Sequence, residues 1–467
     1  FSNFAWMFLQ TEGDYNFSSG SRGRGNLSST ANPYFLFPQI YNFRYNIYSS
    51  EWPVANRAIE LYLQKKSENE GWERQINGLS NNEKANLLLE KHTFKELLAD
   101  VEQRNLQNNI VGLEASRLFA RSEINMGVDA FRDSLYAMLK RNTFLNIKFE
   151  NMLDTLGEMS RTDLYSYLKE WEQLTPLPFY SIGEPELTKV VNKGGEEFFV
   201  LKVLVSNNSD YDGIIQMNVL QNGWWYQPME DPRARKKVEI AAHTSKEFVS
   251  VWEEQIRDVE INTMVSGNLP YMIRQSIGNV KQERNKIVKD TIYTLPESSL
   301  EMPGEVIVDN EDSTLFVLST PAVVGLLPKW LDKVEDTSFK YSGISWWRAP
   351  LQWTATTNAK YYGKYIRSAY VIKSGDGSQT ATWKIPVPEA GQYELYYHVF
   401  KDDELRWNDR LQGEYHFRVA YDSEMEDAYI NLRKANEGWE QLGTYYFSAD
   451  TVRVVLTDEC KLRSVTA

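Results

Sequence analysis

The sequence predicts a multidomain α+β protein in which a helical module precedes two antiparallel β-sandwich domains. Apolar residues recur at spacings of three and four from about residue 53 to 168, which is typical of helices with one buried face. From residue 184 onwards, short apolar runs alternate with Asn-, Asp- and Gly-containing turns, which indicates strands. A length of 467 residues is enough for roughly three domains at about 150 residues each.

The helical module is predicted in two parts, residues 1–115, incomplete at the N-terminus, and their continuation in residues 116–183. The apolar set Leu87, Leu88 and Phe94 illustrates the helical spacing. Ser80-Asn-Asn-Glu83 has the pattern of a capping box, and Ser160-Arg-Thr-Asp163 is an acidic variant of it. Both patterns predict the start of a helix.

The strand-rich part is predicted to form one sandwich over residues 184–280 and a second, of jelly-roll type, over residues 302–467. Runs such as residues 197–205 and 213–220 have the length and composition of strands. Residues 281–301 are charged and poor in apolar side chains, so they are expected to form a linker or an exposed pair of strands.

Composition excludes several classes of protein. The chain carries 51 Lys and Arg against 64 Asp and Glu, a net charge of −13, so it has no general attraction for nucleic acid or for an anionic membrane. The short basic run Arg233 to Lys237 is interpreted as a solvated loop. One cysteine, Cys460, excludes an internal disulfide framework and a cysteine-rich metal site. No apolar run approaches the 18 residues or so of a membrane span.

The N-terminus carries neither an initiator methionine nor a signal peptide. We therefore interpret the chain as the ordered part, or the C-terminal part, of a longer protein, with room for a targeting signal upstream. We expect the protein to be secreted, periplasmic or associated with the outer membrane. High aromatic content, with 14 Trp, 27 Tyr and 21 Phe, is common in carbohydrate-handling and envelope proteins, and also in β-sandwich cores.

Residues 30–280 resemble zinc peptidases of the aminopeptidase N type. The resemblance lies in the helical stretch 146–164, in Tyr167-Leu-Lys-Glu-Trp171 and in Leu177-Pro-Phe-Tyr180, which leads into a β domain. It implies a gluzincin-like helical module in which a His-Glu-x-x-His helix and a later Glu bind zinc.

The zinc motif of that family is degenerate here. Trp52, Asn56 and Tyr62 match the third-ligand helix, but Arg57 stands where the ligand Glu belongs. The His-Glu-x-x-His positions fall on Tyr34, Phe35 and Pro38, and the tyrosine that steadies the oxyanion falls near Phe119. These side chains cannot replace two imidazoles and a carboxylate. We therefore expect no zinc and no other cofactor. The alternative interpretation is that residues 34–63 are a packed helical pair without peptidase ancestry.

The last 165 residues or so resemble the golvesin C-terminal domain, a carbohydrate-binding-like domain related to xanthan lyase. The element Gly438-Trp-x-x-Leu-Gly-x-Tyr-x-Phe447 is its most specific mark, and residues 305–313 look like its opening strand. Further matches are Ala381-Thr-Trp383 and the runs 390–396, 415–421 and 452–456. Alternation places Tyr393, Leu395 and Tyr397 on one strand face and Glu394, Tyr396 and His398 on the other. His398 and His416 are expected to be cross-strand residues rather than ligands.

An aromatic cluster lies in this C-terminal part, with Trp346, Trp347 and Trp353 as its indoles. Flat rings of this kind form stacking platforms for sugars or anchor a protein partner, and they also serve as core and loop packing. We take the three tryptophans as candidate binding residues.

The sequence therefore predicts a non-catalytic binding or scaffolding protein of the bacterial cell envelope, with a glycan or another envelope protein as partner. One alternative is an active zinc aminopeptidase-like enzyme. The other is a glycan-acting chain, a polysaccharide lyase or hydrolase accessory, which would need two carboxylates across a cleft.

Overall fold

A computed structural model describes most of the chain after residue 44. It covers residues 45–63, 70–143, 145–174, 176–191, 194–220, 231–278, 280–284, 288–297, 300, 304–319, 339–344, 349–401, 413–422 and 424–467. The chain divides into two compact units. The first consists of residues 1–68 and 81–298, and the second of residues 69–80 and 299–467.

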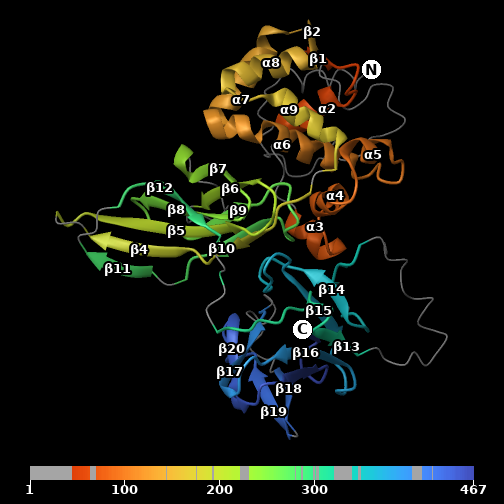
Figure 1. Ribbon diagram of the computed structural model, residues 1–467, viewed down its shortest axis with the longest axis vertical. Helices are drawn as coiled ribbons and strands as arrows, with labels where there is room; N and C mark the ends of the chain where they lie inside the picture. Colours follow the sequence, from red (N-terminus) through yellow and green to blue (C-terminus); the bar gives the residue numbers. More distant parts are fainter. Residues whose placement is uncertain are drawn as a thin grey trace, which may run out of the picture. The chain divides into compact units, whose positions relative to one another are not determined.

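Helices make up the N-terminal part of the first unit (Figure 1). They are α2 (Ala55–Leu63), α4 (Asn81–Leu89), α5 (Phe94–Ala99), α6 (Gln107–Met126), α7 (Val128–Arg141), α8 (Phe149–Ser160), α9 (Leu164–Lys169) and the 3₁₀ turn η1 (Glu170–Glu172). A parallel strand pair, β1 (Tyr45–Tyr48) and β2 (Leu145–Lys148), adjoins them. The long helix α6 is central because α2, α4, α5, α7, α8 and α9 all contact it. Its buried Phe119 packs against the rings of Tyr62 and Phe131.

One of the two predicted helix starts is correct. Helix α4 begins at Asn81, directly after Ser80, as the Ser80-to-Glu83 pattern predicts. The second prediction is wrong by three residues, because Ser160 ends α8 and Asp163 caps α9 by accepting the Ser166 N–H. Thr93 and Glu96 form a complete capping box at α5.

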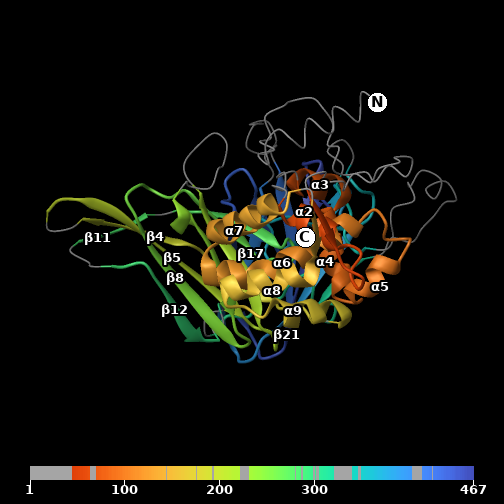
Figure 2. The ribbon, with the colours of Figure 1, turned by 90° about the horizontal axis from the view of Figure 1, so that it is seen from above.

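Two sheets form the β part of the first unit. A four-stranded sheet has the order β10-β9-β6-β7, and a larger one has the order β11-β4-β5-β8-β12 with β3 beside β5, an order that Figure 2 shows. The strands are β3 (Tyr180–Ile182), β4 (Glu186–Val191), β5 (Glu197–Asn207), β6 (Gly213–Leu220), β7 (Arg235–Ile240), β8 (Thr244–Trp252), β9 (Asp258–Asn262), β10 (Met272–Ser276), β11 (Val280–Arg284) and β12 (Thr291–Pro296). Their shared core includes Val203, Phe248 and Ile261, so the sheets pack face to face.

Residues 281–301, for which a linker or an exposed strand pair was expected, contain strands of this larger sheet. β11 pairs with β4 in parallel, and β12 pairs with β8 antiparallel. Both strands lie at sheet edges, and the side chains of β12 are mostly exposed. Charged residues such as Lys281 and Glu283 are common on edge strands, because they discourage the unpaired backbone edge from pairing with another chain.

Ionic contacts join helices to the sandwich within the first unit. Lys237 on β7 pairs with Glu123 on α6, and both side chains are buried. Tyr62 donates to the other oxygen of Glu123 at 2.7 Å. Arg121 pairs with Glu239 at 2.7 Å. The run predicted as a solvated basic loop is therefore part of η2 (Pro232–Ala234) and β7, and its Lys237 is buried.

The described residues of the second unit are mostly in strands and include the helix α3 (Glu70–Asn77). Its sheets have the orders β13-β16-β21-β18-β19, β14-β15-β22 and β17-β20. The strands are β13 (Phe316–Leu318), β14 (Thr354–Thr357), β15 (Ser368–Lys373), β16 (Thr380–Pro386), β17 (Gly391–Val399), β18 (Glu414–Tyr421), β19 (Glu424–Asn431), β20 (Gly438–Phe447), β21 (Thr451–Thr457) and β22 (Ser464–Thr466). Phe316, Ile372, Leu395 and Phe417 are members of one core that all three sheets share.

The predicted β-rich, largely antiparallel domains are confirmed, whereas the gluzincin-like character of the helices stays a prediction. The prediction of an opening strand at residues 305–313 is wrong, because the first paired strand among the described residues of this unit is β13. Turns at Asp309 and Asp312, whose side chains accept nearby backbone N–H groups, interrupt the extended chain before Phe316. None of the described helices is long and apolar enough to cross a membrane.

Candidate functional site

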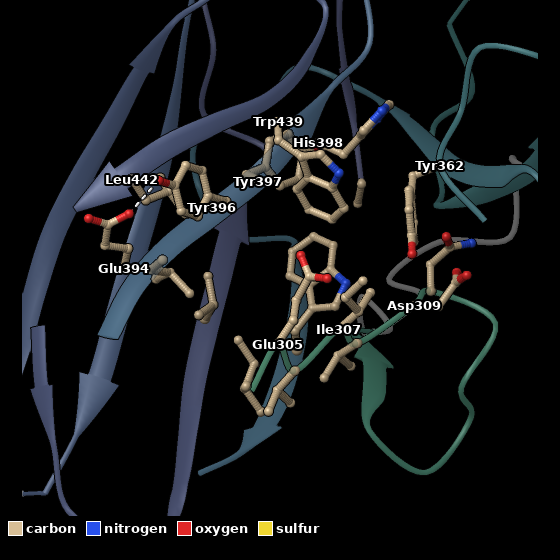
Figure 3. A pocket seen from close by; sticks show the side chains of 18 of the residues that line it. Glu305, Ile307, Asp309, Tyr362, Glu394, Tyr396, Tyr397, His398, Trp439 and Leu442 are labelled. Atoms are coloured by element: carbon tan, nitrogen blue, oxygen red, sulfur yellow. Dashed lines mark hydrogen bonds between the residues drawn. The ribbon is translucent and has the colours of Figure 1, made fainter. Parts of the chain in front are cut away.

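A cavity of about 410 Å³ in the second unit brings together aromatic and acidic side chains (Figure 3). It is bounded by strands β16, β17 and β20, by the segment 304–310 and by the turn at residues 361–362. Pockets for small ligands have volumes of about 300–1,000 Å³, so this one has room for a short ligand rather than a folded partner. We call it the aromatic cleft.

One wall of the aromatic cleft is a group of three rings. His398 on β17 and Trp439 on β20 are register partners in the β17–β20 ladder, and their rings meet edge to face at 5.3 Å. Tyr362 packs against both, at 4.9 Å from Trp439 and 5.7 Å from His398. The Trp439 side chain is nevertheless 46% exposed, so part of the indole is open to a ligand.

The floor of the cleft is apolar and fixed by the core. Trp383 on β16 packs edge to face against Tyr397, whose hydroxyl donates to the Thr466 carbonyl at 2.5 Å. A bulge between Leu395 and Tyr396 shifts the ladder so that Leu442 on β20 is the extra residue, and Leu442 lines the cleft. Above the bulge, Tyr396 is 44% exposed.

Three carboxylates line the same cavity. Glu305 and Asp309 come from the segment before β13, and Figure 3 shows the Glu305 side chain directed toward the rings. Glu394 on β17 accepts a hydrogen bond of 2.5 Å from the Tyr396 hydroxyl, which raises the pKa of that tyrosine. Among the described side chains that line the cavity, none belongs to Lys or Arg.

Two of the lining groups have strongly shifted pKa values. Burial raises the pKa of Asp309 from its ordinary 3.8 to about 6, although nearby backbone N–H groups lower it. Burial, together with the charge of Arg367, lowers the pKa of His398 from 6.5 to about 4. The imidazole is therefore neutral at pH 7, and the cleft presents negative rather than positive charge.

This arrangement fits a ligand that offers both apolar faces and hydrogen-bond donors. Exposed indole and phenol rings supply flat surfaces for stacking. Carboxylates accept hydrogen bonds and have no proton to donate when ionised, and such charge-assisted bonds are stronger than neutral ones. Hydroxyl-rich rings with C–H faces have this combination.

The predicted platform at Trp346, Trp347 and Trp353 lies only partly within the described structure. Trp346 and Trp347 fall outside the described residues. Trp353 is half-buried against the core of the second unit, and it is not among the residues that line the aromatic cleft. The binding role of these three residues stays a prediction.

Arg57 has structural partners at its position on α2. The side chain is buried, its Nε donates to Asn108 at 3.0 Å, and its guanidinium lies 3.6 Å from Glu60. Burial raises the pKa of Glu60 to about 8, more than Arg57 lowers it. The Glu60 carboxylate also accepts from Asn56 at 3.2 Å.

The other positions of the degenerate zinc motif, Tyr34, Phe35 and Pro38, lie outside the described residues. Phe119 is fully buried in the helical core. Within the described ranges, no group of three or more His, Cys, Asp or Glu side chains is arranged to hold a metal ion.

A second hollow lies in the first unit, between α7, β2 and α8. Its volume is about 630 Å³, and its described lining includes Arg141, Asn146, Lys148 and Met159. No aromatic ring is among those lining residues. It therefore lacks the stacking surfaces that distinguish the aromatic cleft.

The sequence did not predict the aromatic cleft, although several residues of the cleft lie in the runs that resemble the golvesin C-terminal domain. Trp439 belongs to the Gly-Trp-x-x-Leu-Gly element, and His398 was expected to be a cross-strand residue, which the ladder confirms. No local signal could pair the two residues, because β18 and β19 separate β17 from β20 in the chain. Asp309 and Glu305 had no such signal either.

Residues 347–467 match the family model of the golvesin C-terminal domain. The predicted resemblance of this part of the chain is thereby confirmed. Most of the aromatic wall and floor lies inside the golvesin-like range, whereas Glu305 and Asp309 precede it.

Among solved structures, the chain is similar to a xanthan lyase from Paenibacillus. The identity is 17% and the TM-score 0.24, over 63% of this chain and 26% of the lyase chain, so the match spans about a quarter of the lyase. No curated protein matches.

Proposed function

We propose that this chain is a non-catalytic glycan-binding or scaffolding protein of the bacterial cell envelope, and that its golvesin-like domain binds the glycan in the aromatic cleft. The observation that carries the proposal is the partly exposed Trp439 beside carboxylates in a cavity of ligand size. Aromatic faces stack on the C–H faces of sugars, and carboxylates accept from sugar hydroxyls.

The peptidase-like part of the proposal concerns the helical module. Arg57 occupies the place of a ligand carboxylate and is already bound to Asn108 and Glu60. This supports a module without peptidase activity, which would serve as a scaffold for the golvesin-like domain. The proposal also places the protein as secreted, periplasmic or associated with the outer membrane, and the golvesin-like range supports this placement.

The binding role is tested by exchanging one exposed ring on β20. Trp439→Ala should lower the affinity for a bound oligosaccharide at least tenfold in isothermal titration of the full chain. Such a loss corresponds to about 1.4 kcal/mol. The screen that finds the oligosaccharide uses an array of bacterial and plant glycans.

Tyr446→Ala is the matched control. Tyr446 lies on the same strand, is 66% exposed and does not line the cavity. Its removal should leave binding unchanged. If wild-type protein bound nothing on the array, or if both variants bound as well as wild type, the proposed site would be wrong.

A glycan-acting enzyme remains the second candidate, because Asp309 has the raised pKa expected of a general acid. Release of reducing ends, or of unsaturated products, from a bound polysaccharide would identify it. Loss of that activity in Asp309→Asn would assign the acid. Absence of products under conditions of saturated binding favours the non-catalytic role.

The remaining alternative is a zinc aminopeptidase. Because Arg57 would repel a cation at the ligand position, purified protein should contain far less than one zinc per chain and should not hydrolyse aminoacyl-arylamides. Elemental analysis measures the zinc. Stoichiometric zinc, lost with activity on chelation, would show that the ligands lie elsewhere.

A further inference from the structure

The charged side chains that line the aromatic cleft are acidic. They are Glu305, Asp309 and Glu394, and the described lining includes neither Lys nor Arg. Arg367, whose charge lowers the pKa of His398, lies outside the described lining and donates to the Ala359 carbonyl at 2.8 Å. Lys364 lies over the ring of Tyr365.

Four hydroxyl groups of the lining donate hydrogen bonds within the protein. Tyr396 donates to Glu394, Tyr397 to the Thr466 carbonyl and Tyr393 to the Glu389 carbonyl. Ser368 donates to Glu311. These hydroxyls are therefore already used as donors, whereas ionised carboxylates offer acceptors only.

We infer that the aromatic cleft selects non-anionic saccharides and rejects glycans whose sugars carry carboxylate, sulfate or phosphate in the cleft. The inference rests on the proposed glycan-binding function and names its ligand class. A neutral sugar presents hydroxyl donors to Glu305 and Asp309 and its C–H face to Trp439. A uronate would place a further negative charge beside these carboxylates, and the described side chains of the lining include no cation to balance it.

The carboxylates and the rings of the cleft come largely from different parts of the chain. Glu305 and Asp309 belong to the segment that precedes the golvesin-like range, whereas Trp439 and His398 belong to β20 and β17 within it. The rings thus supply affinity that is indifferent to charge. The preceding segment supplies two of the three carboxylates that discriminate by charge, and Glu394 on β17 supplies the third. The charge of that segment can therefore be changed without changing the rings.

The test compares glycans that differ only in charge. Hexaoses of β-1,4-linked glucose, mannose and galactose are titrated into the full chain, each before and after oxidation of its primary hydroxymethyl groups to carboxylates. The protein that binds a neutral hexaose should bind the oxidised form at least tenfold more weakly at low salt. Added salt should reduce the difference, because it screens the repulsion.

A variant without the two carboxylate charges tests whether charge, rather than a change in folding, causes the preference. Glu305→Gln/Asp309→Asn keeps the shape of both side chains, and it should reduce the preference for the neutral hexaose to less than threefold. Thermal unfolding checks that the variant is folded. A Glu424→Gln/Glu426→Gln variant on β19 changes net charge equally outside the cleft lining and should keep the preference.

The possible results bear on the two proposals differently. If the oxidised hexaose binds as well as or better than the neutral one, while Trp439→Ala still abolishes binding, the charge selection is wrong and the glycan site stands. If neither form of any hexaose binds, and the glycan array is also negative, the proposed function fails and the selection fails with it.

Discussion

At the residue scale, Asp309 and His398 line the same cleft and change the stability of the folded protein with pH in opposite directions. Burial raises the pKa of Asp309 to about 6, so the folded protein holds this proton more tightly than the unfolded chain does. Burial lowers the pKa of His398 to about 4, so the unfolded chain holds that proton more tightly. Stability therefore falls with rising pH through Asp309 and rises with pH through His398, and between about pH 4 and 6 the two effects offset each other.

Single substitutions should separate these effects. In His398→Gln, the stability of the second unit relative to wild type should fall as the pH rises from 4 to 6.5. In Asp309→Asn it should rise relative to wild type between pH 4 and 6. The slopes should approach about 1.4 kcal/mol per pH unit, the value for one proton. Urea unfolding at several pH values measures them, and slopes of the same sign in both variants would contradict the assignment.

The sequence could not reveal these shifts. His398 and Asp309 are ordinary residues of a predicted strand and of the segment before β13, and a pKa shift depends on burial and on neighbours such as Arg367. Arg57 shows the same limit. The resemblance to zinc peptidases predicts that Arg57 stands where a metal ligand would be, and only the fold shows Asn108 and Glu60 as its partners.

At the scale of elements, the buried pair of Lys237 on β7 and Glu123 on α6 joins a strand to a helix in the first unit. Burial lowers the pKa of Lys237, and the attraction of Glu123 opposes this. Glu123 also accepts from Tyr62 on α2. Elements α2, α6 and β7 thus meet at the Glu123 carboxylate. Removal of Lys237 would leave this buried carboxylate without its ion-pair partner.

Lys237→Met should destabilise the first unit by about 3–5 kcal/mol, the usual cost of breaking a buried ion pair from one side. Arg235→Met is the matched control on the same strand, because Arg235 lies 4.0 Å from Asp129 in a largely exposed pair. Its cost should be about 0–1 kcal/mol. Chemical denaturation measures both, and equal costs would show that the buried pair has no special role.

The pattern of elements followed from the sequence in large part. Helical period and strand alternation are local properties, so residues 53–168 and the strands after 184 could be assigned from them. The edge strands β11 and β12 were harder, because an exposed edge lacks the apolar alternation that identifies a strand.

At the scale of the whole molecule, a discontinuous segment belongs to the second unit. Residues 69–80, which include α3, are part of that unit although they precede it by more than 200 residues. Thr357 donates to the Gly78 carbonyl at 2.8 Å. At Gly343, a Cβ atom would lie 1.9 Å from the carbonyl oxygen of Ile76, so the two backbones touch where only glycine fits.

Gly343→Ala should therefore destabilise the second unit by about 1–3 kcal/mol, as overpacking does. Gly391→Ala is the control within the same unit, since its Cβ would meet only the Tyr393 ring at 3.7 Å. Hydrogen exchange followed by mass spectrometry reads the two units separately. Faster exchange confined to the second unit is the expected result, and an unchanged pattern would contradict this packing.

The sequence by itself determined the order of helical and β-rich parts, the golvesin-like C-terminal domain and the net charge. Each of these is recorded within a short window or in the total composition. The tertiary structure decided the aromatic cleft, whose lining joins residues 304–310, 361–362, 383 and 393–398 with Trp439, Leu442 and Phe447. It also decided the discontinuous second unit and the burial of His398 and Asp309. These features depend on contacts between residues far apart in the chain, and local period and residue type carry no information on which distant segments will pack together.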